Sequence, residues 1–293
     1  MIKGTTKLLG VIGHPIEHSL SPVMHNAALS YLGLDCVYLA FPVKPQDLKA
    51  AISGFAAVGI LGFNVTIPHK QEILPLLSEV SPVARAVGAV NTVYRTEQGW
   101  GGTNTDVQGF LAPLRSHLLK TDTKNDWSQK TVVILGSGGA ARAVVAGCSQ
   151  LGCAEIHVVG RNLQKLTEFQ QSWVNSPLPV KLLTHTWENL SVLISKADLL
   201  VNTTPVGMFP RGGESPVTEA EIDRLREGAI AYDLIYTPNP TQFLIQAQQK
   251  GAIAIDGLEM LVQQGAAALE IWLRQPVPVD VMRQSLRQHL GLN

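Results

Sequence analysis

Short apolar runs alternate with stretches of helical periodicity through the first part of the chain. The runs KLLGVIG, CVYLAF and GILGFNV have the length and the β-branched content of buried strands. Between and after them, apolar residues recur every three or four positions, which predicts helices over residues 22–32, 45–55 and 70–80. An alternation of strands and helices predicts βαβ units and a largely parallel sheet.

The second half of the chain repeats this alternation. Residues 89–103 are expected to form a strand and a turn, followed by a helix from Asp106 to about Leu119. The polar, aperiodic segment KTDTKNDWSQK is interpreted as a linker or surface excursion. Further strands are expected at TVVILG, EIHVVG, ADLLVNTT, AIAYDLIY and AIAID. The pattern therefore predicts two open α/β domains with a cleft between them, namely residues 1–110 completed by C-terminal helices at about 258–293, and residues 111–257.

Composition narrows the class of partner. Hydrophobic residues make up 45% of the chain and charged residues 16%, which suits a globular protein with a large interior. Lys plus Arg equal Asp plus Glu at 23 each, so no basic surface for nucleic acid is expected, and the partner is expected to be a small molecule. The 3 cysteines form no CxxC pair, and no signal peptide or membrane-spanning run is recognisable, which indicates reduced thiols and a cytoplasmic location.

The strongest local motif is a glycine-rich turn between an expected strand and an expected helix. It places Gly136, Gly138 and Ala141 in the pattern GxGxxA. The first glycine allows a tight turn, the second lets the backbone approach a pyrophosphate, and the helix N-terminus offers free N–H groups. In this context the motif predicts that the second domain is a doubly wound, Rossmann-type domain that binds a dinucleotide. A tight strand-to-helix turn without a ligand is the alternative interpretation.

The end of the next strand discriminates between cofactors. A NAD site usually carries Asp or Glu there for the ribose hydroxyl, whereas this chain has Gly160, Arg161 and Asn162, with Lys165 one turn on. The basic side chains favour a 2′-phosphate and so predict NADP. Alternatively, Arg161 and Lys165 belong to a solvated helix start.

Lys70, in the stretch NVTIPHK, occupies an unusual position. It lies in the first turn of the helix expected over residues 70–80. A cation there opposes the helix dipole, whose positive end is at the N-terminus. Removal of the lysine is therefore expected to cost no appreciable stability, and a chemical role explains its position better than a structural one.

Ser21 and Asp106 lie at two other helix starts, where each has an ordinary structural interpretation as an N-cap. In an open parallel sheet, helix N-termini gather at the carboxyl edge of the strands, where such folds bind ligands. Lys70 and Asp106 are therefore expected to form an acid–base pair on one rim. The residues expected on that rim are Ser19, Ser21, Thr66, Lys70 and Asp106.

Eight motifs along the whole chain resemble those of shikimate dehydrogenases. In order, they are SLSP, NVTIPHK, GAVNT, GTNTD, GSGGAARA, NTTPVGM, DLIYTPNPT and DGLEMLVQQGA. The resemblance implies an NADP-dependent oxidoreductase that reduces 3-dehydroshikimate to shikimate in aromatic amino-acid biosynthesis. It also implies that Lys70 and Asp106 are the catalytic dyad.

The resemblance further implies which residues bind each ligand. The substrate carboxylate would be bound by Ser19 and Ser21 with Tyr236 nearby, and the ring hydroxyls by Thr66, Lys70, Asn91, Asp106 and Gln264. The cofactor would be bound by Gly136, Ser137, Gly138, Gly139 and Ala140, by Gly160, Arg161, Asn162 and Lys165, and near the nicotinamide by Leu234 and Gly257. The family commonly has Asn-Arg-Thr where this chain has Gly160-Arg161-Asn162, so the contacts on the adenine side stay open.

The chemistry of the dyad agrees with this assignment. Hydride transfer to a ketone builds negative charge on the carbonyl oxygen, and a positioned ammonium group can donate a proton to it. No metal is needed. The histidines that cluster in sequence, His14, His18, His25 and His69, lack the spacing of metal ligands and are expected on loops or helix surfaces. Asn202 is interpreted as a turn residue.

Several alternatives stay open at this point. The chain could be a dual quinate/shikimate dehydrogenase. A methylenetetrahydrofolate dehydrogenase has a similar two-domain layout, although SLSP and GTNTD argue against it. A non-catalytic NADP-binding sensor would have little reason to keep both Lys70 and Asp106. The sequence does not decide the oligomeric state, for which a homodimer is one option.

Overall fold

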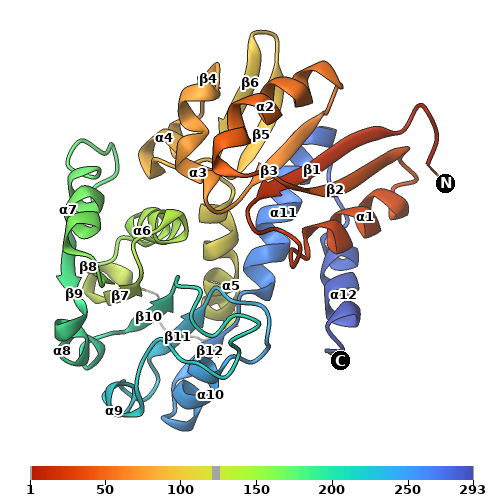
Figure 1. Ribbon diagram of the computed structural model, residues 1–293. Coiled ribbons are helices and arrows are strands. Elements are labelled where there is room, and N and C mark those ends of the chain that lie inside the picture. The colour runs from red at the N-terminus through yellow and green to blue at the C-terminus, as the bar shows by residue number, and fades with distance from the viewer. Residues whose placement is uncertain (1, 121–125, 293) are drawn as a thin grey trace. The chain divides into compact units, whose positions relative to one another are not determined.

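The computed structural model describes residues 2–120 and 126–292. The chain divides into two compact units (Figure 1). Unit 1 comprises Met1–Gly109 and Leu261–Asn293, and unit 2 comprises Phe110–Met260. The first division falls next to the boundary expected at residue 110, and the second falls within the helix that follows residue 257.

Unit 1 contains a six-stranded mixed sheet with the strand order β2-β1-β3-β5-β6-β4. Strand β1 (Lys7–Gly13) is parallel to β2 (Cys36–Pro42) and to β3 (Gly62–Val65). Strand β5 (Thr92–Thr96) is antiparallel to both β3 and β6 (Gly99–Thr103), and β4 (Glu79–Val80) is parallel to β6. The expected strand and turn over residues 89–103 is thus a β-hairpin, and its strand β5 is the antiparallel strand in an otherwise parallel sheet.

Helices from both ends of the chain belong to unit 1. The C-terminal helix α12 packs alongside α1, as Figure 1 shows. Apolar side chains of β1, β3 and β5, with Trp100 of β6, form the core that holds α2 against the sheet. The helices are α1 (Ser21–Tyr31), α2 (Leu48–Ala57), α3 (His69–Glu72), α4 (Pro82–Val87), the start of α5 (Asp106–Lys120), most of α11 (Leu258–Leu273) and α12 (Val279–His289), with 3₁₀ turns at Pro45–Asp47 and Leu74–Leu76.

The helix expected over residues 70–80 is much shorter than its periodicity suggested. Only α3 forms, with 4 residues, and the chain then enters a 3₁₀ turn and β4. Pro75 lies in that 3₁₀ turn, where it lacks an N–H and cannot continue an α-helix. Because a single turn aligns few peptide dipoles, the argument that Lys70 opposes a strong helix dipole loses its force.

Unit 2 contains a six-stranded sheet in which every strand pair is parallel, with the order β12-β11-β10-β7-β8-β9. In chain order within the unit this is the doubly wound arrangement, whose order reverses between β7 and β10. The Rossmann-type prediction is confirmed. The strands are β7 (Thr131–Leu135), β8 (Glu155–Gly160), β9 (Leu182–Thr186), β10 (Leu199–Asn202), β11 (Ile230–Asp233) and β12 (Ile253–Ile255).

The strands of unit 2 read as continuous apolar runs because helices cover both faces of a parallel sheet. The central core joins buried residues of β7, β10 and β11 to α8 and α10. The helices are α6 (Gly139–Leu151), α7 (Leu163–Gln171), α8 (Leu190–Ile194), α9 (Glu219–Ile222) and α10 (Gln242–Gln249), with 3₁₀ turns at Trp127–Gln129 and Trp187–Asn189.

The segment interpreted as a linker is only partly a surface excursion. Its residues 121–125 lie outside the described part of the chain. Trp127, in the described part, is buried and begins the 3₁₀ turn that leads into β7. At Trp127 the segment is therefore buried, in contrast to the expected surface excursion.

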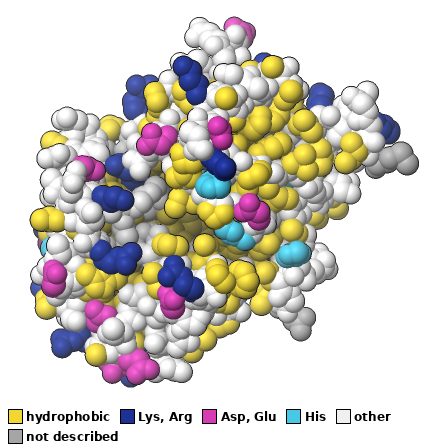
Figure 2. All heavy atoms as spheres, viewed as in Figure 1, with side chains coloured by type: hydrophobic (Ala, Val, Ile, Leu, Met, Phe, Trp, Pro, Cys, Tyr) yellow, Lys and Arg dark blue, Asp and Glu magenta, His cyan; other side chains and the backbone are white. Residues whose placement is uncertain are grey.

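The distribution of charged side chains and the lengths of the helices agree with the composition. Basic and acidic side chains are interspersed over the face seen in Figure 2, as the balanced composition leads one to expect. Within residues 2–120 and 126–292, no helix is long and apolar enough to cross a membrane.

Candidate active site

Three parallel strands of unit 1 direct the candidate residues to one edge of the sheet. Strands β1, β3 and β6 run in the same direction, because β5 is antiparallel to both β3 and β6. Ser19 and Ser21 follow the carboxyl end of β1, Thr66 and Lys70 follow that of β3, and Asp106 follows that of β6. A Cβ atom on Gly13, at the end of β1, would lie only 2.5 Å from Cγ2 of Thr66, so these two chain segments are in close contact.

Lys70 and Asp106 form an ion pair at this edge. Nζ of Lys70 donates to Oδ2 of Asp106 at 2.5 Å, and the side chains are 18% and 7% exposed. The other carboxylate oxygen, Oδ1, accepts from Nδ2 of Asn91 at 2.9 Å. Both oxygens of the carboxylate are therefore occupied, and the ion pair holds the ammonium group of Lys70 in one place.

The N-cap interpretations of Ser21 and Asp106 are wrong. Helix α5 begins at Asp106 itself, and Oδ1 of Asn104 accepts from the N–H of Val107 at 3.3 Å. Helix α1 likewise begins at Ser21, and Leu20 at its N-cap position provides no side-chain cap. Because Asn104 serves the start of α5, the carboxylate of Asp106 is free to bind Lys70.

Asn91 is the polar centre of the site, with 2% of its surface exposed. The backbone N–H of Thr105 donates to Oδ1 of Asn91 at 2.8 Å, which fixes the orientation of the amide. Nδ2 then donates to Asp106 and, at 3.3 Å, to Oε1 of Gln264 from α11. The structure thus brings Asn91, Gln264, Lys70 and Asp106 together.

Three polar residues beneath this group were not singled out from the sequence. Nδ2 of Asn64 donates to the Asn91 carbonyl at 3.0 Å and to Oγ1 of Thr92 at 3.1 Å. Oγ1 of Thr105 accepts from Nδ2 of Asn91 at 2.9 Å. All three lie inside the motifs NVTIPHK, GAVNT and GTNTD, so the motifs contained them, but strand register decides which members point inward.

The histidine expectation is half wrong. His14 and His18 are exposed, whereas His25 and His69 are fully buried. Nε2 of His69 lies 2.7 Å from the Val43 carbonyl. Among the residues that the structure describes, no group of three or more His, Cys, Asp and Glu side chains is placed to hold a metal ion.

The glycine-rich turn of unit 2 has the shape of an anion site. Gly136 has φ +102°, and a Cβ there would lie 2.8 Å from Oγ1 of Thr203, so only glycine fits. Gly138, before the 13-residue helix α6, gives no side-chain cap, and a Cβ at Gly138 would meet no atom within 4 Å. The free N–H groups at the start of α6, around Gly139 and Ala140, and the space in front of them fit a pyrophosphate.

The segment after β8 presents two exposed cations, Arg161 and Lys165. Oδ1 of Asn162 accepts from the N–H of Lys165 at 2.9 Å, so this side chain is the N-cap of α7. A Cβ on Gly160 would lie 3.0 Å from Cδ2 of Leu166, which occupies the space at the strand end. The exposed cations suit a 2′-phosphate, and the neighbouring Gly160 and Asn162 have local structural reasons.

Leu234 and Tyr236 follow β11, and both are half-buried. The backbone there is in close contact with Gly257, and the neighbouring Asp233 is held by hydrogen bonds. A Cβ on Gly257 would lie 2.3 Å from the Leu234 carbonyl oxygen. The carboxylate of Asp233 accepts from Nδ2 of Asn202 at 3.0 Å, Oγ1 of Thr241 at 2.7 Å and the N–H of Ile235 at 3.1 Å. Burial raises the pKa of Asp233 to about 6.

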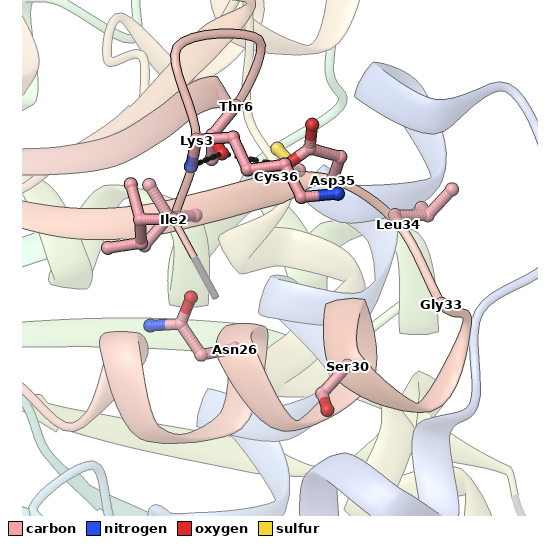
Figure 3. A pocket seen from close by; sticks show the side chains of 10 residues that line it. Ile2, Lys3, Thr6, Asn26, Ser30, Gly33, Leu34, Asp35 and Cys36 are labelled. Atoms are coloured by element: carbon pink, nitrogen blue, oxygen red, sulfur yellow. Dashed lines mark hydrogen bonds between the residues drawn. The ribbon is translucent and has the colours of Figure 1, made fainter.

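Figure 3 shows a pocket of unit 1. It lies at the end of the sheet opposite to the candidate residues. It borders the N-terminal ends of β1 and β2, where Oγ1 of Thr6 donates to Asp35 at 2.6 Å. Asn26 and Ser30 of α1 line its other side. Since the candidate residues follow the carboxyl ends of the strands, this pocket is separate from the site.

Comparison with protein families gives three matches along the chain. Residues 11–93 match the family model described as the shikimate dehydrogenase substrate binding domain. Residues 118–237 match shikimate / quinate 5-dehydrogenase, and residues 257–287 match the shikimate 5′-dehydrogenase C-terminal domain.

Individual proteins agree with these matches. The chain is 66% identical over 293 residues to shikimate dehydrogenase (NADP(+)) of Trichormus variabilis, and it covers 100% of both chains. A crystal structure of shikimate dehydrogenase in complex with NADP+ is 38% identical, with TM-score 0.85 and coverage of 99% of this chain and 98% of that one. Quinate dehydrogenase from Corynebacterium glutamicum in complex with NAD has TM-score 0.86 but 29% identity, with coverage of 97% and 99%.

Proposed function

This chain belongs to the shikimate dehydrogenase family, and on that basis we propose that it catalyses the reversible, NADP-dependent reduction of 3-dehydroshikimate to shikimate. The observation that carries the proposal is the Lys70–Asp106 pair, with 2.5 Å between Nζ and Oδ2. A non-catalytic NADP-binding sensor would have little reason to keep both Lys70, whose side chain is 18% exposed, and the buried Asp106. The family assignment sets aside a methylenetetrahydrofolate dehydrogenase.

Lys70 is the proposed proton donor. Bound NADPH supplies the hydride. As negative charge develops on the substrate's carbonyl oxygen, the Lys70 ammonium group stabilises it and donates a proton, and in the oxidation of shikimate the neutral amine accepts that proton. Asp106 orients the amine through Oδ2, and Asn91 holds Asp106 through Oδ1.

The other proposed substrate contacts surround this pair. Asn91, Gln264 and Thr66 present amide and hydroxyl groups that can bind ring hydroxyls. Ser19 and Ser21, after β1, are proposed to bind the carboxylate, with Tyr236 as a further contact. Carboxylate binding is the same in the ground and transition states, so it affects KM more than kcat.

NADP binding is assigned to unit 2. The residues from Gly136 to Ala140 are proposed to hold the pyrophosphate, and Arg161 and Lys165 to bind the 2′-phosphate. Leu234 and Gly257 are proposed to border the nicotinamide. The close packing at Gly136 and Gly257 supports this assignment, because a side chain at either position would overlap neighbouring atoms.

The test is turnover of the purified full chain with a panel of shikimate and quinate, each with NADP+ and NAD+. We expect shikimate with NADP+ to be the best pair, with shikimate favoured over quinate by at least ~10² in kcat/KM. Ser19→Ala and Ser21→Ala should each raise KM for shikimate more than they lower kcat. Comparable kcat/KM for the two acids would establish the dual quinate/shikimate alternative, and no turnover with either would favour the sensor. A cytoplasmic location and a homodimer are further proposals that this assay does not address.

A further inference from the structure

Asp233, a buried carboxylate of unit 2, holds the segment that follows β11. The residue is 0% exposed and is the last residue of the strand. Its Oδ1 accepts from the backbone N–H of Ile235 at 3.1 Å and from Nδ2 of Asn202 at 3.0 Å. Its Oδ2 accepts from Oγ1 of Thr241, just before α10, at 2.7 Å. An apolar side chain would avoid the cost of burying a carboxylate, so these three bonds need a reason.

Asn202, at the end of β10, is oriented by its own contacts. It is the register partner of Asp233 in the parallel pair of β10 and β11. Oδ1 of Asn202 accepts from the backbone N–H of Thr204 at 3.0 Å, so the amide presents Nδ2 to Asp233. Nδ2 also donates to the Val206 carbonyl at 3.3 Å. The amide of Asn202 therefore fastens the turn after β10 to the carboxylate of Asp233.

The backbone held in this way is the backbone proposed to border the nicotinamide. Leu234 lies between Asp233 and Ile235, and its N–H donates to the Asn202 carbonyl at 3.1 Å. The N–H of Gly257 donates to the Ile235 carbonyl at 3.2 Å. A Cβ on Gly257 would lie 2.3 Å from the Leu234 carbonyl oxygen, so the two backbones pack too closely to move independently. The bonds of Asp233 thus act on both segments.

We propose that Asp233 is a positioning residue for the nicotinamide half of NADP, which acts by holding the backbone at Leu234 and Gly257. This inference rests on the proposed function, because it takes those two residues as neighbours of the nicotinamide. The role needs hydrogen-bond acceptors in fixed places and not a negative charge. Both donors to Oδ1 are N–H groups that can only donate, whereas the hydroxyl of Thr241 can turn and accept. An asparagine at this position can therefore keep all three bonds, with its Nδ2 directed to Thr241.

The test is the affinity of the purified full chain for two probes, measured by isothermal titration calorimetry without turnover. NADP+ carries the nicotinamide, whereas adenosine 2′,5′-bisphosphate carries only the adenine half with its 2′-phosphate. Asp233→Ala should raise Kd for NADP+ roughly 5- to 50-fold, the size of one to two net hydrogen bonds, and leave Kd for the bisphosphate within about twofold. Asp233→Asn should bind both probes as the wild type does. If Asp233→Ala does not fold, Asn202→Ala, which leaves Asp233 two of its donors, should raise Kd for NADP+ roughly 2- to 10-fold and spare the bisphosphate.

Asp198→Ala is the matched control. Asp198 lies immediately before β10, at the opposite end of the same sheet, and its Oδ2 accepts from the backbone N–H of Thr131 at 2.8 Å. Loss of this carboxylate should lower the free energy of unfolding and leave both Kd values unchanged.

The role of Asp233 would be overturned by an unchanged Kd for NADP+ in Asp233→Ala, by an equal loss for both probes, or by the same loss in Asp198→Ala. A weakened affinity for NADP+ in Asp233→Asn would assign the effect to the charge and would also overturn it. A wild-type chain that binds NADP+ but does not oxidise shikimate would refute the proposed function, while the binding measurements would still decide the role of Asp233. A wild-type chain that does not bind NADP+ would refute both.

Discussion

Replacement of Lys70 by methionine tests both the chemistry and the stability of the site. Methionine keeps an unbranched stem of similar length but removes the ammonium group, so Oδ2 of Asp106 loses its partner at 2.5 Å. Asn91 still donates to Oδ1, at 2.9 Å, which leaves a buried carboxylate with one neutral donor. The argument from the helix dipole predicts no appreciable loss in the free energy of unfolding. The observed ion pair predicts a clear loss.

The magnitude follows from how deeply the pair is buried. Breaking a fully buried ion pair costs about 3–5 kcal/mol, and an exposed pair contributes about 0.2–1 kcal/mol. The side chains of Lys70 and Asp106 are 18% and 7% exposed, which places the pair nearer the buried limit. We expect Lys70→Met to lower the free energy of unfolding by about 2–3 kcal/mol. The double variant Lys70→Met/Asp106→Asn, in which both groups are neutral, should recover most of that loss.

Urea unfolding of the full chain at constant m-value measures the stability, and steady-state oxidation of shikimate measures kcat. Lys49→Met is the control, because Lys49 is an exposed lysine on α2 in the same unit. In Lys70→Met, kcat should fall by roughly 10²–10⁴, the usual range for an acid–base catalyst. Unchanged stability would refute the ion-pair argument, and near-native kcat would refute the proton-donor role.

Three further changes test unit 2. Arg161→Ala should weaken the affinity for NADP+ roughly 10- to 150-fold and leave the affinity for NAD+ nearly unchanged. Arg224→Ala, at another exposed arginine, is the control. Equal losses of affinity for both cofactors would show that Arg161 serves the fold and not the 2′-phosphate. Gly257→Ala should lower the free energy of unfolding by about 1–3 kcal/mol and weaken the use of NADP+, because its Cβ would lie 2.3 Å from the Leu234 carbonyl oxygen. The control Gly213→Ala, whose Cβ meets no atom within 4 Å, should change neither property. Equal behaviour of the two variants would contradict this packing argument. Burial raises the pKa of Asp233 to about 6 from 3.8, so the stability it contributes is full below pH 3.8 and is lost as the pH rises through 6. Thermal melts should therefore show wild type losing up to about 3 kcal/mol relative to Asp233→Asn between pH 4 and pH 7, and parallel pH profiles of the two proteins would exclude this.

The sequence predicted the parts of the fold that depend on local pattern. Unit 2 follows its apolar runs closely, and only the edge strand β9 was missed, because the sequence LLTHT is half polar and lacks a clear alternation. In unit 1 the periodicity of residues 70–80 was outweighed by Pro75, and the hairpin of β5 and β6 was expected as a strand and a turn. The spacing of apolar residues continues past Pro75, so this spacing alone does not show that the proline ends the helix.

The site was less accessible to sequence reasoning because it depends on one-residue details. Whether Asp106 caps α5 or lies inside its first turn is a shift of a single position, within the usual uncertainty of helix boundaries. That shift decides whether its carboxylate binds backbone N–H groups or Lys70. Asp233 and His25 give no signal at all, since an aspartate at a strand end and a histidine in a helix look like ordinary surface residues until the tertiary contacts are known.

The position of Lys70 is explained by Asp106 and not by its helix. A proton donor to a developing alkoxide must be charged, aimed at the substrate and able to regain its proton from solvent after each turnover. The buried carboxylate holds the ammonium group in place, because an unpaired Asp106 at 7% exposure would be costly. The Lys70 side chain stays 18% exposed, more than the 7% of Asp106. A fully exposed lysine would lose this orientation, so the burial of its carboxylate partner supports the proposed role of Lys70 as proton donor.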